Sequence, residues 1–378
     1  MNNIPDSLLK HYNALFVCPF HQTVLASTLV GVTTGYLLLR RPAPAPRTLP
    51  SPRVKPPTAL TPYPPTILPG SRLVPTPHGT ISVSEFGPEH GRKILMIHGI
   101  STPSVIFASL ATALASDGYR VMVFDLFGRG YSDAPTDVPY DERLYGTQIL
   151  YALYSSPISW DRFSIVGYSL GGGIAVSFAA NFGERLESLV LLAPAGLLKA
   201  KSMGLMMKLA RGGWVPAMIE NWMLTRQLGA RAEAHSNDAP SDDGMDYAKV
   251  MAWQALNHRG FPLAFGSTFR FGPIYDRQEE WKQAAKKGIM RIGIMVGEKD
   301  AVIPPSLLPA MVEALGGADR VRGEILPGGG HSLVRERWRD CADFISDVVG
   351  DPEGDADDLY PEDDEMMASQ SSYVNADF

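Results

Sequence analysis

One short stretch near the middle of the chain, Gly167-Tyr168-Ser169-Leu170-Gly171, constrains the fold more than any other. It follows an apolar run at residues 163–166 and leads into a small-residue segment at 172–175. This order predicts a strand, a sharp turn and a helix, in which glycines two residues before and after the serine keep side chains away from the turn. Such a turn presents the hydroxyl of Ser169 as a nucleophile and places the amide of Leu170 at a helix N-terminus, where it can face an oxyanion. The alternative is a glycine-rich turn with an incidental serine.

The region around this stretch, residues 71–349, alternates between predicted strands and predicted helices. The predicted strands are apolar runs, mostly rich in β-branched residues, at residues 81–83, 94–97, 121–124, 163–166, 189–192, 292–296 and 324–326. Helical periodicity lies between most of them, for example at residues 104–116, 141–155 and 335–349. This alternation predicts an α/β fold with a mostly parallel sheet and helices on both faces. From residue 197 to about 275 the composition is helical without a convincing strand, which predicts a helical cap inserted over the carboxyl ends of the strands.

A serine hydroxyl becomes a nucleophile when a neighbouring base takes its proton and a third group orients that base. His331 follows a predicted strand and a glycine-rich loop at 327–330, so we expect it at the same edge of the sheet as Ser169. Asp300 follows another predicted strand and is expected to reach His331, with Glu298 as the reserve carboxylate. The alternative for Asp300 is a loop aspartate that caps the following helix. Serine, aspartate and histidine in this order, each after a separate strand, predict a catalytic triad.

The strand predicted at residues 94–97 ends in His98, Gly99 and Ile100. A glycine at this place lets the following backbone approach a bound acyl group. The amide of Ile100 is therefore expected to join that of Leu170 in an oxyanion hole. His98 is expected to hold this loop in place rather than to take part in catalysis.

These features resemble the α/β-hydrolase fold family over residues 71–349. Beside the serine turn and the pair His98-Gly99, the segment Asp125-Leu126-Phe127-Gly128-Arg129-Gly130-Tyr131-Ser132 resembles the loop which that family carries after its fourth strand. The resemblance implies a nucleophile at Ser169, a base at His331 and an orienting acid at Asp300, similar to esterases and lipases. Family members that hydrolyse epoxides or dehalogenate alkanes carry an aspartate at the turn, so Ser169 argues against both of these activities.

The sequence implies no cofactor and no nucleic-acid partner. It contains neither an H-E-x-x-H zinc motif nor a G-x-G-x-x-G dinucleotide fingerprint. The net charge of −6 conceals an imbalance, because residues 350–378 hold ten acidic and no basic residues. The rest of the chain has 34 basic and 30 acidic residues, a net charge of +4 that does not indicate nucleic-acid binding. Residues 350–378 are predicted to form a disordered acidic tail.

A membrane anchor is predicted near the N-terminus, after a short segment at residues 1–13. Residues 14–39 carry no charged side chain, and residues 23–39 would form about 26 Å of helix, nearly the thickness of a bilayer core. We therefore predict a transmembrane helix at 14–39. The interruptions at its start leave a shorter helix lying on the membrane surface as the alternative. Basic residues follow the run, only two cysteines occur, and N-x-Ser/Thr motifs are absent, so the catalytic domain is predicted to face the cytosol.

Between the predicted anchor and the predicted domain lies a proline-rich segment. Residues 42–77 contain thirteen prolines. Proline removes a backbone donor and disfavours helix at the preceding residue. Residues 40–70 are therefore predicted to form an extended, semi-rigid linker.

The predicted function is hydrolysis of a carboxylic ester or thioester through an acyl-enzyme on Ser169. Seven of the fifteen methionines and several aromatic residues fall in the predicted cap. With a membrane anchor, they favour a small lipophilic acyl substrate, although packing of the cap onto the core explains any one of them equally well. The same triad would also serve acyl transfer to an alcohol or hydrolysis of a carbon–carbon bond. A membrane-tethered binding protein on this fold is a further alternative, for which a broken triad is expected.

Overall fold

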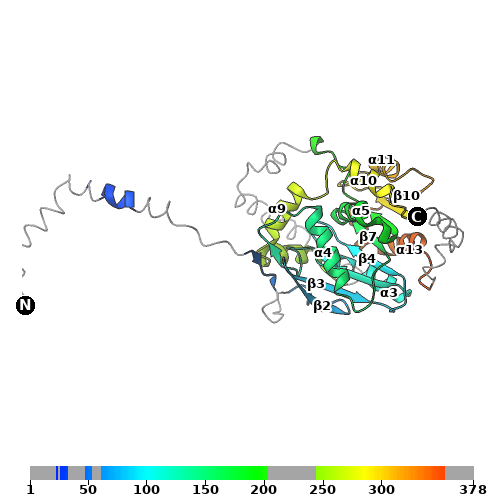
Figure 1. Ribbon diagram of the computed structural model, residues 1–378, viewed down its shortest axis with the longest axis horizontal. Coiled ribbons are helices and arrows are strands. Elements are labelled where there is room, and N and C mark those ends of the chain that lie inside the picture. The colour runs from blue at the N-terminus through cyan, green and yellow to red at the C-terminus, as the bar shows by residue number, and fades with distance from the viewer. Residues whose placement is uncertain (1–22, 24–25, 33–46, 53–60, 203–243, 354–378) are drawn as a thin grey trace, which may run out of the picture. The chain divides into compact units, whose positions relative to one another are not determined.

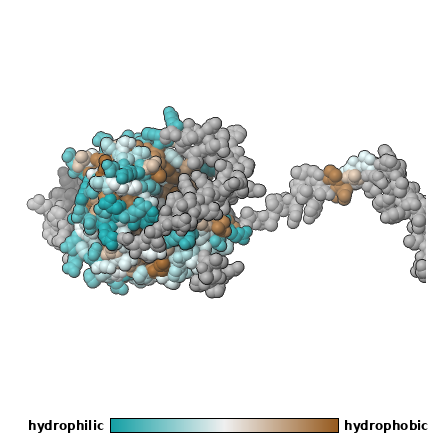
Figure 2. All heavy atoms as spheres, turned by 180° about the vertical axis from the view of Figure 1, so that it is seen from behind, coloured by the Kyte–Doolittle hydropathy of each residue, from teal (hydrophilic) through white to brown (hydrophobic). Residues whose placement is uncertain are grey.

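The computed structural model describes residues 23, 26–32, 47–52, 61–202 and 244–353. The chain divides into two compact units, Met1–Pro46 and Arg47–Phe378. In the first unit residues 26–32 are helical, and exposed hydrophobic side chains mark this segment (Figure 2). No helix within the described residues is both long enough and apolar enough to cross a membrane. Most of the transmembrane helix predicted at 14–39 lies outside the described residues, so it stays a prediction.

The second unit is built on an eight-stranded sheet in the order β10-β9-β8-β7-β4-β5-β3-β2 (Figure 1). In chain order these strands are β2 Ser71–Thr76, β3 Gly79–Phe86, β4 Lys93–Ile97, β5 Arg120–Phe124, β7 Phe163–Tyr168, β8 Leu186–Leu192, β9 Arg291–Gly297 and β10 Val321–Leu326. The six strands from β10 to β5 pair in parallel, whereas β3 pairs antiparallel with both β2 and β5. Strands β7 and β8 are buried along their whole length, as strands covered on both faces are. The predicted mostly parallel sheet is confirmed.

Helices cover both faces of this sheet. They are α3 Ala108–Ser116, α4 Glu142–Tyr154, α5 Leu170–Phe182, α10 Gln278–Ala285, α11 Leu308–Ala314, α12 Leu333–Glu336 and α13 Trp338–Val349. The chain moves from β4 to β5 in one direction along the sheet and from β7 to β8 in the other. Right-handed crossovers therefore place α3 and α5 on opposite faces. Helix α13 packs against α3, while α4 and α10 pack against α5 (Figure 1).

The predicted helices agree with the structure apart from their ends. Residues 104–116 form a 3₁₀ turn, Ser104–Phe107, that continues into α3. Helix α4 begins after Asp141, whose side chain accepts hydrogen bonds from the amides of Arg143 and Leu144 and so caps the helix. The helix predicted at 335–349 is interrupted at Arg337, between α12 and α13.

The proline-rich segment packs against the domain where the structure describes it. Strand β1 (Thr48–Leu49) pairs antiparallel with β6 (Ala134–Pro135). Tyr63 and Leu68 are 4% and 5% exposed and belong to the hydrophobic core. Residues 47–52 and 61–70 together form what we name the N-terminal strap. This packing departs from the extended linker predicted over 40–70, because prolines exclude helix but do not keep neighbouring apolar side chains from the core.

In the region predicted to be a cap, the described residues form two helices, α8 Tyr247–Asn257 and α9 Phe261–Phe271. Residues 203–243 lie outside the described part. The side-chain amide of Gln254 on α8 donates to the carbonyl of Ser101 (2.8 Å) and accepts from the amide of Gly130 (2.7 Å). Because these two loops follow β4 and β5, this part of the region lies at the carboxyl edge of the sheet, where the cap was predicted.

The start of the predicted acidic tail is attached to the domain. The hydroxyl of Tyr119 donates to the carbonyl of Gly350 (2.7 Å), and the amide of Arg92 donates to the carbonyl of Pro352 (3.1 Å). Residues 354–378 lie outside the described residues, so disorder there stays a prediction.

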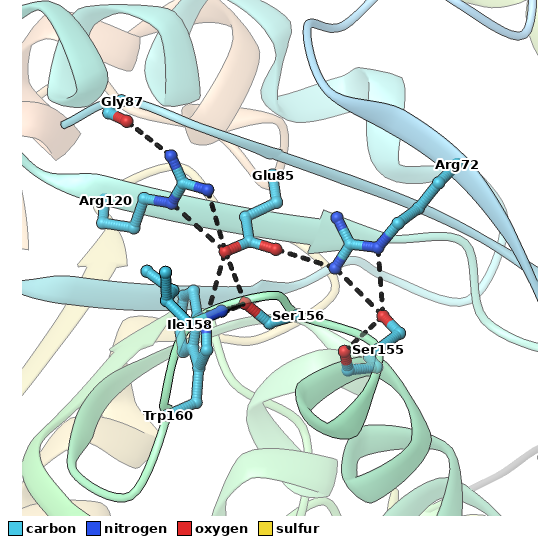
Figure 3. Close-up of polar contacts among 9 residues, drawn as sticks. Arg72, Glu85, Gly87, Arg120, Ser155, Ser156, Ile158 and Trp160 are labelled. Carbon is cyan, nitrogen blue, oxygen red and sulfur yellow. Dashed lines mark hydrogen bonds and ion pairs between the residues drawn. The ribbon is translucent and has the colours of Figure 1, made fainter. Parts of the chain in front are cut away.

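A buried ionic cluster fastens β2 and β3 to the rest of the sheet (Figure 3). The side chain of Glu85 is fully buried and pairs with Arg72 (2.7 Å) and Arg120 (3.1 Å). The Ser156 hydroxyl and the Trp160 indole also donate to this carboxylate. Burial raises the pKa of Glu85, but the hydrogen bonds and the arginine charges outweigh burial and hold the pKa below its usual value. The cluster lies toward the amino end of β5, away from the carboxyl edge.

Candidate active site

Ser169 lies in the turn between β7 and α5, as predicted. Its backbone has φ 54° and ψ −117°, a conformation that residues with a side chain rarely adopt. The Ser169 amide donates to the carbonyl of Leu192 (3.0 Å). Its carbonyl accepts from the amides of Gly172 (2.9 Å) and Ala195 (2.8 Å). These three hydrogen bonds hold the strained turn and so fix the direction of the serine side chain.

The two glycines that flank the turn are required by space. A Cβ at Gly171 would lie 2.0 Å from the carbonyl oxygen of Ile97, and one at Gly167 would lie 2.4 Å from the carbonyl oxygen of Gly171. Both obstacles are backbone atoms, which cannot swing aside as a flexible side chain does. The pattern of glycines around Ser169 therefore follows from the close approach of α5 to the ends of β4 and β7.

The structure brings Ser169, His331 and Asp300 together. Oγ of Ser169 lies 3.0 Å from Nε2 of His331, and Nδ1 of His331 lies 2.8 Å from Oδ2 of Asp300. The Asp300 side chain is fully buried, and its Oδ1 accepts from the amides of Val302 and Ile303 (both 2.8 Å). With Asp300 as acceptor, the imidazole carries its proton on Nδ1, and Nε2 is left to accept from the serine hydroxyl.

A close approach between β9 and the glycine-rich loop places His331. A Cβ at Gly297, the last residue of β9, would lie 2.5 Å from the carbonyl oxygen of Gly329, so the loop passes directly over the end of the strand. Glu298, the reserve carboxylate, accepts from the amide of Gly328 (2.7 Å). Glu298 therefore holds the loop that leads to His331, and Asp300 is the acid that contacts the imidazole.

Tyr168, which precedes the serine, also holds His331 and was not predicted to do so. Its hydroxyl donates to the carbonyl of His331 (3.0 Å), and the two ring centroids lie 5.5 Å apart. Burial and the nearby charge of Asp300 raise the pKa of Tyr168 well above its usual value, so the hydroxyl keeps its proton as a donor.

The loop after β4 runs beside the serine. A Cβ at Gly99 would lie 3.4 Å from Cβ of Ser169. The buried ring of His98 donates from Nδ1 to the carbonyl of Gly99 (2.8 Å) and accepts at Nε2 from the amide of Leu126 (2.9 Å). Burial lowers the pKa of His98 to about 3, so the ring is neutral. Because the Gly99 carbonyl and the Ile100 amide point in opposite directions from one planar peptide, His98 also fixes the direction of the Ile100 amide.

Leu170, the other predicted oxyanion donor, is the first residue of α5. At this position helical geometry leaves the backbone amide without an intrahelical acceptor. Ile100 and Leu170 thus lie on two segments that flank Ser169, the loop after β4 and the start of α5. Their joint action as an oxyanion hole stays a prediction.

Two of the aromatic side chains on the described helices of the predicted cap, Trp253 and Phe261, are buried in the protein, whereas Phe271 is exposed. The rings of Trp253 and Tyr131 lie 5.6 Å apart, and both residues belong to the hydrophobic core. Phe261 is fully buried. For Trp253 and Phe261, packing rather than contact with a substrate explains the apolar character. Trp214 and Trp222 lie outside the described residues.

The loop after β5 contributes buried polar groups whose contacts were not predicted from the sequence. The carboxylate of Asp125 accepts from the amide and hydroxyl of Ser104 (2.8 and 2.7 Å) and from the amide of Tyr131 (2.8 Å). A Cβ at Gly130 would lie 2.2 Å from this carboxylate, so the loop closes tightly around it. The sequence signal for this loop was the resemblance of residues 125–132 to the loop that the family carries after its fourth strand, which assigned no role to Asp125. Across the described ranges, no cluster of three or more histidine, cysteine or acidic side chains is placed to hold a metal ion.

Comparison with known proteins identifies the family. A family model described as "alpha/beta hydrolase fold" matches residues 93–337, more than half of the chain. A serine hydrolase-like protein of Danio rerio is 32% identical over 140 residues, which cover 37% of this chain and 42% of that protein. The match therefore spans less than half the length of that relative.

Two solved structures have a similar fold. The esterase RhEst1 from Rhodococcus sp. ECU1013 aligns with a TM-score of 0.58 and 19% identity, covering 74% of this chain and 98% of that one. A membrane phospholipase A described as a bacterial virulence factor aligns with a TM-score of 0.58 and 20% identity, covering 91% of this chain and 99% of that one. At these identities the likeness concerns the fold alone. With the match of the family model, it follows that this chain belongs to the α/β-hydrolase fold family.

Proposed function

We propose that this protein is a serine hydrolase that cleaves a carboxylic ester or thioester through an acyl-enzyme on Ser169. The observation that carries the proposal is the chain of contacts from Ser169 Oγ to His331 Nε2 (3.0 Å) and from His331 Nδ1 to Asp300 Oδ2 (2.8 Å). As Oγ attacks the acyl carbon, His331 takes the hydroxyl proton and Asp300 stabilises the imidazolium that forms. The amides of Ile100 and Leu170 bind the negative charge that develops on the acyl oxygen.

The same groups complete the formation of the acyl-enzyme and then its hydrolysis. His331 gives its proton to the leaving alcohol or thiol as the bond to the acyl carbon breaks. Water then enters, loses a proton to Nε2 and attacks the acyl carbon. Collapse of this second intermediate returns the proton to Oγ and releases the carboxylic acid. The acid and the alcohol or thiol are the only products, and the enzyme is regenerated.

The comparisons support a hydrolase. The zebrafish relative is named a serine hydrolase-like protein, and RhEst1 is named an esterase. A lipophilic acyl group is part of the proposal because the predicted cap is rich in methionine and because another structural neighbour is named a membrane phospholipase A.

The test uses an activity probe and a substrate panel. A fluorophosphonate probe should label the full chain and leave Ser169→Ala unlabelled, because the probe reacts with an activated serine. A panel of short- and long-chain acyl esters and thioesters then defines the acyl group. Equal labelling of both proteins would remove Ser169 from the mechanism. A wild type that turns over no member of the panel would favour a binding protein, and product analysis with a competing alcohol separates hydrolysis from acyl transfer.

We also propose that residues 14–39 anchor the chain as a single transmembrane helix, with the catalytic domain facing the cytosol. The uncharged run and the basic residues that follow it support this placement. Carbonate extraction should leave the full chain in the membrane pellet, whereas a helix lying on the surface would be released. On sealed microsomes, added protease should digest the catalytic domain, and protection until detergent is added would reverse the orientation.

A further inference from the structure

Arg129, in the loop after β5, is a fully buried cation. Its hydrogen bonds with other described residues all go to neutral acceptors, and none of its partners among those residues is a carboxylate. Removing a charge from water costs several kcal/mol when no opposite charge compensates it. Burial of the Arg129 charge therefore destabilises the fold if packing is the only role of this side chain. The groups to which it donates indicate a second role.

The guanidinium joins four parts of the fold. Nε donates to the carbonyl of Ile100, in the loop after β4 (3.2 Å). Nη1 donates to the carbonyl of Phe127, in the loop after β5 (2.9 Å), and to the hydroxyl of Tyr145 on α4 (3.3 Å). Nη2 donates to the hydroxyl of Thr268 on α9 (2.9 Å). The planar fork of arginine can satisfy all of these acceptors at once, whereas the single ammonium of lysine cannot.

The contact with Ile100 lies next to the predicted oxyanion donor. The carbonyl before the Ile100 amide, that of Gly99, is held by His98, and the carbonyl after it is held by Arg129. Both peptide planes that meet at the Ile100 Cα are therefore fixed. An oxyanion donor is effective because it is aimed before the charge develops, and a displacement of about 1 Å can cost roughly 100-fold in rate.

The contact with α9 continues as a directed chain of hydrogen bonds. The Thr268 hydroxyl donates to the carbonyl of Ala264 (2.6 Å) and so can only accept from its other partners. One of these is the Tyr145 hydroxyl (2.5 Å), which in turn accepts from Arg129. The position of α9 is thereby linked, through buried groups, to the peptide that follows the Ile100 amide.

We propose that Arg129 is a positioning residue for the reaction: it fixes the backbone that carries the Ile100 oxyanion donor and couples this backbone to helix α9. The proposal rests on the proposed function, because an oxyanion forms only if Ser169 attacks an acyl group. Loss of Arg129 then weakens stabilisation of the oxyanion while the contacts among Ser169, His331 and Asp300 remain.

The first variant is Arg129→Met in the full chain, which keeps a long side chain and removes the donors and the charge. The assay measures kcat and KM with the best ester of the panel, and inhibition by a trifluoromethyl ketone that adds to Ser169 and forms an oxyanion. We expect kcat to fall by about 10- to 100-fold, somewhat less than for deletion of an oxyanion donor, with KM nearly unchanged. Affinity for the trifluoromethyl ketone should fall in parallel with kcat/KM.

A second variant, Thr268→Val, is close to isosteric and removes one acceptor of Arg129 without removing the charge. Thr268→Val should also lower kcat and the affinity for the ketone, but by less than Arg129→Met does. Because both variants break the same chain of contacts, the fold-decrease in kcat of the double variant should be smaller than the product of the fold-decreases of the two single variants. Glu85→Gln is the matched control: it also alters a fully buried charge, but toward the amino end of β5, and should lower stability without changing kcat.

Each result decides the proposal. Wild-type kcat and wild-type ketone affinity in folded Arg129→Met would overturn it and leave the serine mechanism intact. So would a loss of stability and an increase in KM without a loss of ketone affinity, since that is what a purely structural arginine produces. If Arg129→Met does not fold, Thr268→Val decides by the same two readouts. A wild type that neither turns over an ester nor reacts with the probe overturns the proposed function and this proposal together.

Discussion

At the scale of single residues, the proposed chemistry depends on which ring nitrogen of His331 carries the proton. Oδ2 of Asp300 sets this by accepting from Nδ1, while two backbone amides occupy Oδ1. Those amides also decide what an asparagine would do at this position. Its oxygen would be held by the amides of Val302 and Ile303, and its NH₂ group would face Nδ1 of His331.

Asp300→Asn should therefore leave the fold intact and lower kcat by about 1,000- to 10,000-fold. The NH₂ group forces Nδ1 to accept, so the proton moves to Nε2, and Nε2 can no longer take the proton of Ser169. Glu298→Gln is the matched control, because it makes the same chemical change two residues earlier, while the remaining side-chain oxygen can still accept from the amide of Gly328, so most of the activity should be retained. Steady-state kinetics on the best ester of the panel measures both. Equal activity in the two variants would show that Asp300 does not orient the base.

The triad could be predicted from the sequence because each member follows a recognisable strand, and the ends of parallel strands meet at one edge. The roles of Tyr168 and Arg129 could not. Arg129 donates to the hydroxyl of Thr268, 139 positions further along the chain, and only the folded structure brings the two together. Tyr168 was visible as part of the serine turn, but its bond to the carbonyl of His331 depends on where the last loop comes to lie.

At the scale of elements, the antiparallel hairpin of β2 and β3 is held to the parallel sheet by the cluster around Glu85 (Figure 3). The pKa of Glu85 lies below its usual value in the folded protein. Its carboxylate therefore stabilises the fold fully above the pKa of the unfolded chain, and this stabilisation is lost as the pH falls through the lower pKa of the folded state.

Glu85→Gln should lower the free energy of unfolding at pH 7 by about 3 kcal/mol, because Arg72 and Arg120 lose a buried partner. The difference between wild type and variant should be constant down to about pH 5 and should narrow below about pH 4, where Glu85 of the wild type becomes protonated. Urea denaturation across this pH range measures the difference. A difference that is absent at pH 7, or that widens in acid, would contradict the role given to the cluster.

The elements that could be predicted from the sequence are those buried on both faces, such as β7 and β8, since each contains a mostly apolar run, at residues 163–166 and 189–192. Strand β2 was not recognised as a strand because half of its residues are polar, none of its residues is fully buried and it contains Pro75. At the edge of the sheet such a strand is tolerated, because its outer backbone groups need no partner strand.

At the scale of the whole molecule, the catalytic unit includes the N-terminal strap and begins before residue 71. Beside the burial of Tyr63 and Leu68, the amide of Ser51 donates to the carboxylate of Asp133 (2.8 Å), in the loop after β5. The proline-rich composition of the strap predicted an extended linker. Proline content indicates the local backbone conformation, but it does not indicate which side chains are buried in the core.

A chain that starts at residue 71 should therefore be less stable than one that starts at residue 47. Burial of a large apolar side chain contributes about 1.5–3 kcal/mol, so loss of Tyr63 and Leu68 alone should lower the free energy of unfolding by about 3 kcal/mol or more. Urea denaturation of residues 47–353 and 71–353 makes the comparison, with Leu68→Ala in the longer chain as an intermediate. Equal stability of the two chains would show that the strap contributes nothing to the catalytic unit.

An acyl-enzyme on Ser169 can be detected by mass spectrometry of the enzyme quenched in acid during turnover of an ester. We expect the peptide containing Ser169 to gain the mass of the acyl group and to lose it when the substrate is exhausted. Asp300→Asn should accumulate the adduct more slowly, and Ser169→Ala should show none. An acyl group found on another residue, or turnover by Ser169→Ala at the wild-type rate, would contradict the proposed mechanism.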